Sequence, residues 1–118
     1  MGQNSSTIDA LRKAVETRDA GSMKALYAAD ATLTVIDKDN PPSRPRTIVG
    51  ASAIGSYYDD VCGRDMTHKI EYGLHEGNQL AYLQGCRYPD GTRVMASSTA
   101  ELGPKGIVKQ ITVQAWDV

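Results

Sequence analysis

Polar side chains that could bind or polarise a small molecule alternate along the final segment of the chain. In Ile107 to Asp117 a row with a spacing of two consists of Gln110, Thr112, Gln114 and Trp116. Because successive side chains of a β-strand point to opposite faces, these four residues share one face. Their amide and hydroxyl groups can donate and accept hydrogen bonds to a ligand oxygen. The opposite register, with both glutamines in solvent, stays open as an alternative.

One histidine is placed where an imidazole could carry a proton. His68 opens a segment of period two, in which it shares a face with Ile70, Tyr72 and Leu74. Imidazole titrates near neutral pH, so we predict His68 as a catalytic proton carrier. The aromatic rings of Tyr72 and Trp116 are candidate ligand platforms. The alternatives are a half-buried strand histidine without a role and two aromatic residues that belong to the core.

Composition and charge exclude several other classes of function. The 118 residues include 13 Lys and Arg against 14 Asp and Glu, and this near balance favours neither nucleic acid nor an anionic membrane. No apolar run approaches the ~20 residues that span a bilayer, and the N-terminus lacks an apolar signal core, so we expect a cytoplasmic protein. Cys62 and Cys86 form no C-x-x-C pair. We expect reduced thiols and predict neither a metal nor another cofactor.

Helices are expected in the first half of the chain. The predicted helices run from Ser6 to about Arg18, from Asp19 to Asp30, and from Gly50 to about Gly63. Ser6 with Asp9 resembles a capping box, residues 1–5 are expected to be disordered, and Tyr27 falls on the buried face of the second helix. The positions predicted to form the core are Leu11, Val15, Leu26 and Ile54.

Strands are expected between and after these helices, which makes the fold class α+β in one domain spanning residues 1–118. The predicted strands are Thr32–Ile36, Thr47–Val49, Met66 to the turn at Glu76, Gln79–Tyr88, Arg93–Leu102 and Ile107–Asp117. The segment Asp37–Arg46 contains three prolines and is predicted as a loop at the rim of a cavity. Its Lys38, Arg44 and Arg46 either hold an anionic ligand or are simply solvated.

The segments ALYAADATLTV and GASAIGSYY, with a last strand that opens GIVKQ and closes AWD, resemble the nuclear transport factor 2-like superfamily. This superfamily includes SnoaL-like cyclases and ketosteroid isomerases, and the resemblance covers about Ile8 to Asp117. It implies a cone-shaped roll, in which three N-terminal helices pack on a strongly bent, mainly antiparallel sheet around a pocket. The same fold hosts enzymes, binding proteins and association modules, so it does not define the activity.

The resemblance also tests the chemistry residue by residue. The base, the oxyanion tyrosine and the partner aspartate of ketosteroid isomerases fall at about Val35, Leu11 and Thr99, which cannot perform those roles. Two supporting tyrosines are retained as Tyr27 and Tyr58. SnoaL-like cyclases use an Asp with a nearby His. His68 matches the histidine of this pair, but no acidic residue falls at a convincing inward position on the last two strands.

The sequence therefore predicts a protein that binds a small organic molecule. The resemblance implies that the pocket side chains are Tyr27, Tyr58, Tyr72, Gln110, Gln114 and Trp116, with His68 as the catalytic residue. The enzymatic form would be acid–base isomerisation or cyclisation of a carbonyl-containing or polycyclic substrate. The alternative is a non-catalytic binding or dimeric association module. The apolar stripe Ile107, Ile111, Val113 and Ala115 predicts a homodimer through the sheet.

Overall fold

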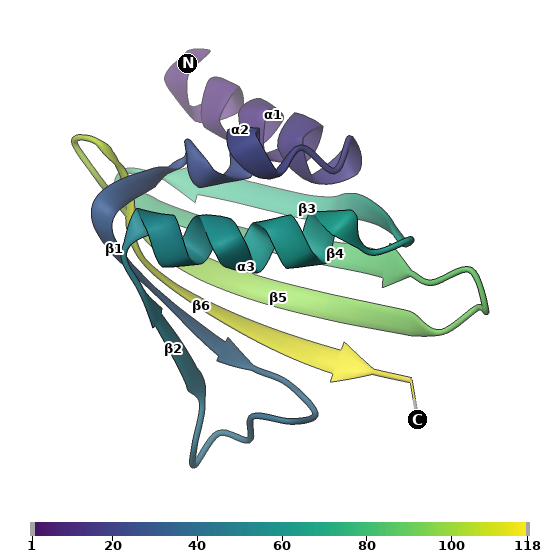
Figure 1. The fold of residues 1–118 in the computed structure, drawn as a ribbon. Helices are drawn as coiled ribbons and strands as arrows, with labels where there is room; N and C mark the ends of the chain where they lie inside the picture. The colour runs from purple at the N-terminus through teal and green to yellow at the C-terminus, as the bar shows by residue number, and fades with distance from the viewer. Residues whose placement is uncertain (1, 118) are drawn as a thin grey trace.

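Three helices cover one face of a curled six-stranded sheet (Figure 1). The structure is a computed structural model that describes residues 2–117, with side chains from residue 7 onward. The helices are α1 (Gly2–Glu16), α2 (Ala20–Lys24) and α3 (Ala51–Gly63). The strands are β1 (Tyr27–Ile36), β2 (Arg46–Val49), β3 (Thr67–Glu76), β4 (Gln79–Arg87), β5 (Arg93–Gly103) and β6 (Gly106–Trp116). The predicted α+β class is confirmed.

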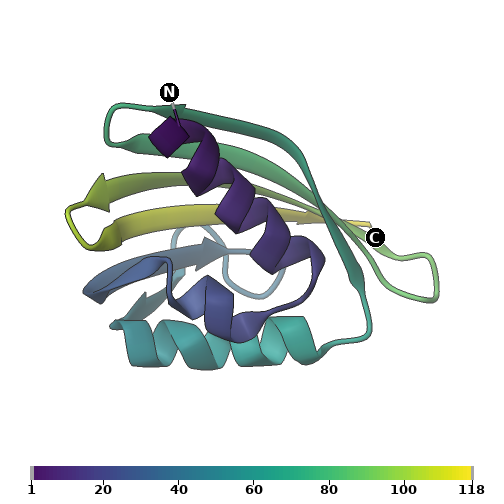
Figure 2. The ribbon, with the colours of Figure 1, turned by 90° about the horizontal axis from the view of Figure 1, so that it is seen from above.

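The sheet is mixed, and its strand order is β2-β1-β6-β5-β4-β3. Strands β3 to β6 form the predicted antiparallel meander, whereas β1 pairs with β6 in parallel and with β2 antiparallel. Figure 2 shows α3 beside β1 and β2, and α1 crossing above the β3 side. No described helix is long and apolar enough to cross a membrane.

The core lies between the helices and the face of the sheet that they cover. Leu11, Val15 and Ile54 are buried there, as predicted, and Leu26 is half-buried against the same cluster. Burial of aliphatic side chains of this size stabilises a fold by about 1.5–3 kcal/mol each. The predicted positions are therefore those that join α1 and α3 to the sheet.

The first helix begins earlier than predicted. It starts at Gly2, within the segment for which disorder is predicted, and Ser6 lies inside the helix instead of capping it. Met1 lies outside the described residues. Helix propagation adds one hydrogen bond for each residue fixed, which lets a polar segment extend a helix that packing has already formed. The predicted cap at Asp19 is confirmed, because its carboxylate accepts a hydrogen bond from Ser22 N.

The second helix is shorter than predicted, and Tyr27 belongs to β1 instead of to a helix. The turn between β5 and β6 explains this end. Ile107 N donates to Leu26 O at 2.8 Å, which draws the chain after α2 into the sheet. Gly106 makes the contact feasible: it has φ +119°, and a Cβ there would lie 2.6 Å from Leu26 O.

Two irregularities change which side chains face the helices. A bulge between Ile70 and Tyr72 reverses the alternation of β3, so Tyr72 is 71% exposed on the outer face and Leu74 follows it. The prediction that both share the face of His68 is therefore wrong. A register shift between β5 and β6 places Ile107 in the core, not in the outer stripe. Glu16 Oε2 accepts a hydrogen bond from Ile70 N at 3.1 Å, beside the bulge.

Candidate functional site

A cavity of about 430 Å³ lies between α3, strands β3 to β6 and the loop before β2. Its apolar walls are Val61 and Met66 on one side and Val94 and Ala96 on β5. The rim includes four loop-region residues, Asp37, Lys38, Asp39 and Arg46. These residues belong to the Asp37–Arg46 segment, which the sequence predicted as a loop at the rim of a cavity.

The inner end of the cavity rests on a hydrogen-bonded group that we call the hydroxyl floor. Its members are Tyr27, Tyr58, Tyr82, Ser98, Gln110 and Thr112. Gln110 is 1% exposed and organises the group. Its Oε1 accepts from Tyr27 at 2.7 Å, and its Nε2 donates to Tyr82 at 2.9 Å and to Thr112 at 3.0 Å. Both ends of the amide are therefore satisfied inside the protein.

The directions of the other bonds in the hydroxyl floor follow from those of Gln110. Tyr27 has one proton and gives it to Gln110, so in the 2.8 Å contact between Tyr27 and Tyr58 the donor is Tyr58. Ser98 and Thr112 hydroxyls lie 2.8 Å apart. Burial raises the pKa values of Tyr27, Tyr58 and Tyr82, so these phenols keep their protons at neutral pH.

His68 lies in the wall of the cavity and is 8% exposed. Its Nδ1 lies 3.0 Å from Gln84 Nε2 and 3.2 Å from Cys86 Sγ. Since the Gln84 amide nitrogen can only donate, Nδ1 accepts and the imidazole proton resides on Nε2. Among the described residues, Nε2 is buried without a hydrogen-bond partner. Burial, with a smaller contribution from the charge of Arg18, lowers the pKa of His68, so it is neutral at pH 7.

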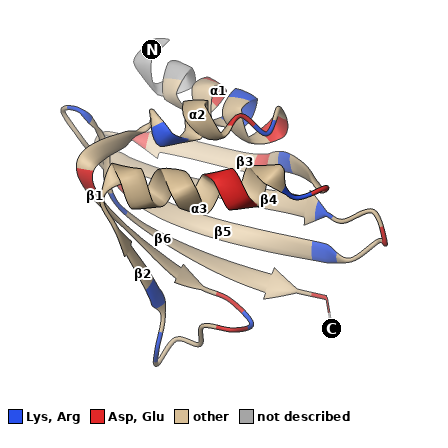
Figure 3. Cartoon of the chain, viewed as in Figure 1, with Lys and Arg blue, Asp and Glu red and all other residues tan. Residues whose placement is uncertain are grey.

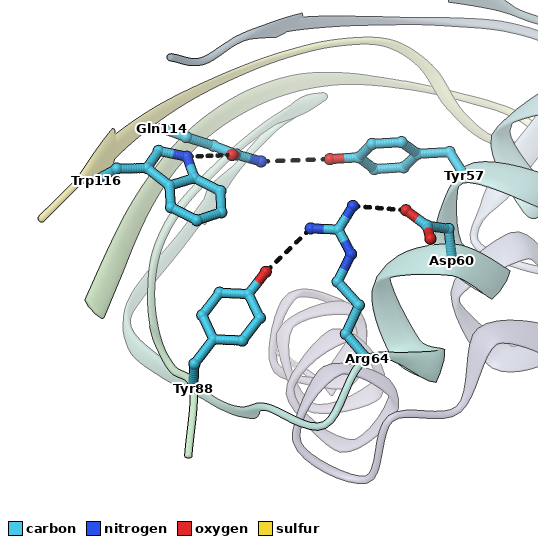
Figure 4. A network of polar contacts seen from close by, with 6 residues as sticks. All are labelled: Tyr57, Asp60, Arg64, Tyr88, Gln114 and Trp116. Carbon is cyan, nitrogen blue, oxygen red and sulfur yellow. Dashed lines mark hydrogen bonds and ion pairs between the residues drawn. The ribbon is translucent and has the colours of Figure 1, made fainter. Parts of the chain in front are cut away.

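Aromatic and cationic side chains surround the outer end of the cavity (Figure 4). We call five of them the mouth cluster: Tyr57, Arg64, Tyr88, Gln114 and Trp116. Trp116 Nε1 donates to Gln114 Oε1 at 3.0 Å, and Gln114 Nε2 donates to Tyr57 at 3.4 Å. Arg64 donates to Tyr88 at 3.1 Å and forms an ion pair with Asp60 at 2.6 Å. Burial raises the pKa of Tyr57 to about 12.

The charged residues of the rim are distributed over the loop and the end of α3 (Figure 3). Lys38 Nζ lies 4.7 Å from the centre of the Trp116 ring, and the Arg46 guanidinium lies 5.5 Å from that of Tyr57. Asp37 Oδ1 accepts three hydrogen bonds from Asp39 and Asn40, so this carboxylate stabilises the loop. The cation–π contacts of Lys38 and Arg46 hold the two ends of the loop at the rim and contribute about 0.5–1 kcal/mol each.

The structure brings together only part of the predicted site. Of the predicted site residues, those that line the cavity are Tyr58, His68, Gln114 and Trp116. Tyr27 and Gln110 lie behind its surface, in the hydroxyl floor, and Tyr72 is on the opposite face of the sheet. The predicted inward orientation of four side chains on the last strand agrees with their burial. Gln110 and Thr112 are buried, and Gln114 and Trp116 are half-buried. The alternative register, with both glutamines in solvent, is wrong.

Several cavity residues were not predicted. Tyr82, Gln84 and Cys86 share the inner face of β4, and the strand alternation from Leu80 onward contains the signal that would have found them. The pairing of His68 with Cys86 follows from the same register. Arg64 carries no such signal, because it lies in the connection after α3, where no periodicity applies.

The positions that correspond to ketosteroid isomerase residues lack acid–base groups. Val35 and Leu11 are buried core residues, and Thr99 is exposed on the outer face, so the inward hydroxyl nearby on β5 is that of Ser98. Among the residues that line the cavity, the only carboxylates are those of Asp37 and Asp39 at the rim. No group of three His, Cys, Asp or Glu within the described residues could hold a metal ion.

Comparisons with known proteins identify the fold. No family model and no curated protein sequence matches this chain. A nuclear transport factor 2-like protein of unknown function from Mesorhizobium loti matches with TM-score 0.80 at 13% identity, over 96% of this chain and 91% of that one. A putative ketosteroid isomerase from Kribbella flavida gives 0.78 at 15% identity, over 98% and 78%. A ketosteroid isomerase-like protein from Catenulispora acidiphila, in complex with trimethylamine, gives 0.66 at 15%, over 90% and 82%.

These similarities show that the chain has the nuclear transport factor 2-like fold, as its sequence predicted. At such low sequence identity they extend to the fold alone. The fold does not define an activity, so the evidence for function comes from the residues of the cavity.

Proposed function

We propose that this chain binds a small organic molecule that carries at least one oxygen, in the cavity between α3 and the sheet. The observation that supports the proposal is a cavity whose apolar walls are combined with polar side chains, among them His68, Gln84 and Gln114. The volume of about 430 Å³ falls in the usual range of about 300–1,000 Å³ for ligand pockets.

Binding without turnover is the form of the proposal that fits the chemistry best. A general base for carbon acids needs a group that accepts a proton readily near neutral pH. His68 presents a protonated Nε2 to its surroundings, its other nitrogen is engaged by Gln84, and its pKa is lowered by burial. The cavity carboxylates lie at the rim, and one of them stabilises the loop.

A second candidate function is acid–base isomerisation or cyclisation of a carbonyl-containing substrate. The position of His68 in the cavity wall favours it, because a neutral imidazole can polarise a carbonyl oxygen by donating a hydrogen bond. In this version His68 is the catalytic residue, and Tyr58 and Tyr82 support the bound oxygen. His68→Gln should then abolish turnover of a bound substrate while leaving its Kd within about threefold.

A cavity-filling variant tests binding directly. Ala96 lies on β5 in the cavity wall, and Ala96→Leu should reduce the space for a ligand. The matched control is Ala53→Leu on the exposed side of α3. Native mass spectrometry of the purified protein, and NMR titration with a set of small oxygenated aromatic compounds, should show binding that Ala96→Leu loses and Ala53→Leu keeps. Equal binding by both variants would contradict the proposal.

Assembly as a homodimer through the outer face of the sheet is part of the same proposal. That face carries Tyr72, Leu74, Met95, Ile111 and Val113, all partly or largely exposed. Soluble monomers rarely expose contiguous apolar patches of this kind. Sedimentation velocity at micromolar concentration should detect a dimer, and Val113→Lys should shift it toward monomer. A wild-type monomer would overturn this part. A cytoplasmic location is likewise proposed, and cell fractionation tests it.

A further inference from the structure

The mouth cluster holds more hydrogen-bond donors than its internal contacts use. The Tyr57 oxygen accepts a bond from Gln114, and the Tyr88 oxygen accepts one from Arg64, so each phenol proton is left available. A neutral phenol has one proton to donate. The raised pKa of Tyr57 keeps that proton in place at physiological pH.

Gln114 is oriented so that it also presents a donor. Its carbonyl oxygen is occupied by Trp116 Nε1 at 3.0 Å, which fixes the amide with its nitrogen toward the cavity side. One N–H of that nitrogen points to Tyr57, and the second remains. Arg64 adds N–H groups beyond the two that contact Tyr88 and Asp60. Figure 4 shows these side chains around a common space at the end of α3.

The charges at the rim also favour a ligand that is negatively charged. Residues lining the cavity include Lys38, Arg46 and Arg64, against two carboxylates. In the part of the chain that the structure describes, Lys38 and Arg46 have no carboxylate within 4.0 Å, whereas Arg64 is paired with Asp60. Their cationic groups instead lie over Trp116 and Tyr57, so these two ring faces are already occupied by protein cations. A cationic ligand would have to displace them.

We propose that the mouth cluster binds the carboxylate of a small aromatic acid, whose ring lies along the apolar walls of the cavity. A carboxylate offers only acceptors, which matches the surplus of donors from Tyr57, Arg64, Tyr88 and Gln114. Arg64 supplies charged N–H donors beyond the one that contacts Asp60. Lys38 and Arg46 add positive charge that no carboxylate of the described residues within 4.0 Å neutralises. The wall residues Val61 and Val94 contact the ring. This assignment rests on the proposed binding function and specifies the class of ligand.

Three probes of similar shape separate the alternatives: benzoate, benzamide and benzyltrimethylammonium. At constant low ionic strength, NMR titration of the wild type should give a Kd for benzoate at least tenfold below that for benzamide, whose amide group would face donors. Benzyltrimethylammonium should bind more weakly still. Arg64→Met should lose at least tenfold in affinity for benzoate, whereas Arg87→Met, at the exposed end of β4, should change it by less than twofold.

A second variant guards against a folding defect at Arg64. Gln114→Glu preserves the size of the side chain and the acceptor for Trp116, but it replaces a donor with a negative charge. It should lose benzoate at least tenfold and retain benzamide, with unchanged far-UV circular dichroism. Benzamide or the ammonium probe binding as tightly as benzoate would overturn the carboxylate assignment. If Ala96→Leu still abolished that binding, the proposed function would stand. Failure of all three probes to bind would overturn the aromatic-acid assignment, whereas the comparison of Ala96→Leu with Ala53→Leu over the wider set of compounds decides the proposed function.

Discussion

The hydroxyl floor and the mouth cluster are both rich in tyrosine and glutamine, yet their hydrogen bonds are arranged differently. In the floor, the amide of Gln110 is fully engaged by Tyr27, Tyr82 and Thr112, and the amide itself is buried. In the mouth, Gln114 is half-buried and keeps an N–H that its contacts with Trp116 and Tyr57 do not use. The same residue type is therefore fully engaged in one place and keeps an unused donor in the other.

This difference separates structural polar groups from candidate binding groups. A buried polar network whose members satisfy one another strengthens and specifies the core, and it has little capacity left for a ligand. Groups that keep unused donors in a cavity can bind without first breaking an internal bond. Gln110 is more deeply buried than Gln114. Gln114 is nevertheless the better candidate for a ligand contact, because it keeps an unused donor.

The largest effect is expected from breaking the floor. Gln110→Met removes an acceptor from Tyr27 and donors from Tyr82 and Thr112, and each buried group left unpaired costs about 1–3 kcal/mol. Urea unfolding should therefore show a loss of several kcal/mol. The matched variant Gln114→Met should lose clearly less. Equal losses would show that the two regions do not differ in the way described.

An intermediate and pH-dependent effect is expected at His68, which has one engaged and one unpartnered nitrogen. Its folded pKa lies below the ordinary value of 6.5, so the unfolded chain binds the proton more readily. Stability should therefore fall as pH decreases below about 6.5. Urea unfolding at pH 7, 6 and 5 should show a smaller decrease for His68→Gln than for the wild type. His75→Gln, at the β3–β4 turn, is the control, and an identical slope in all three proteins would contradict the assignment.

The smallest effect on stability is expected in the mouth. Tyr88→Phe removes one half-buried hydroxyl and its contact with Arg64, and substitutions of this kind usually change stability by about 0.5 kcal/mol or less. Thermal unfolding should place this variant close to the wild type. A loss as large as that of Gln110→Met would mean that the mouth also serves as part of the core.

The sequence predicted the fold well because most of its elements are strongly periodic. The meander from β3 to β6 and the core positions Leu11, Val15 and Ile54 follow from strand and helix periods together with strong turn signals. The helical assignment of Tyr27 failed because the apolar residues after Met23 fit a helix and a strand equally well. The deciding contact, between Leu26 and the distant turn at Gly106, is tertiary.

The site was less predictable, since a single inserted residue exchanges the two faces of a strand. The bulge before Tyr72 moved that residue to the outer surface, and the shift near Ile107 moved an expected outer residue into the core. Alternation correctly placed Gln110 inside but could not show that its amide is satisfied there. That knowledge requires the positions of partners on two other elements, Tyr27 on β1 and Tyr82 on β4.

The parallel pairing of β1 with β6 has a consequence for how the chain folds. β1 precedes α3 and the whole meander along the chain. In the sheet, however, β1 lies between β2 and β6, so its position depends on β6, the last strand of the described chain. Until β6 has been synthesised, β1 and β2 can pair only with each other and pack against α3, and a two-stranded hairpin is marginally stable in water on its own. Contacts between such distant segments slow folding, because a long loop must close before they form. During synthesis on the ribosome, the pair of β1 and β2 therefore lacks its β6 partner until β6 has emerged. Their unpaired edges are exposed to aggregation during that interval.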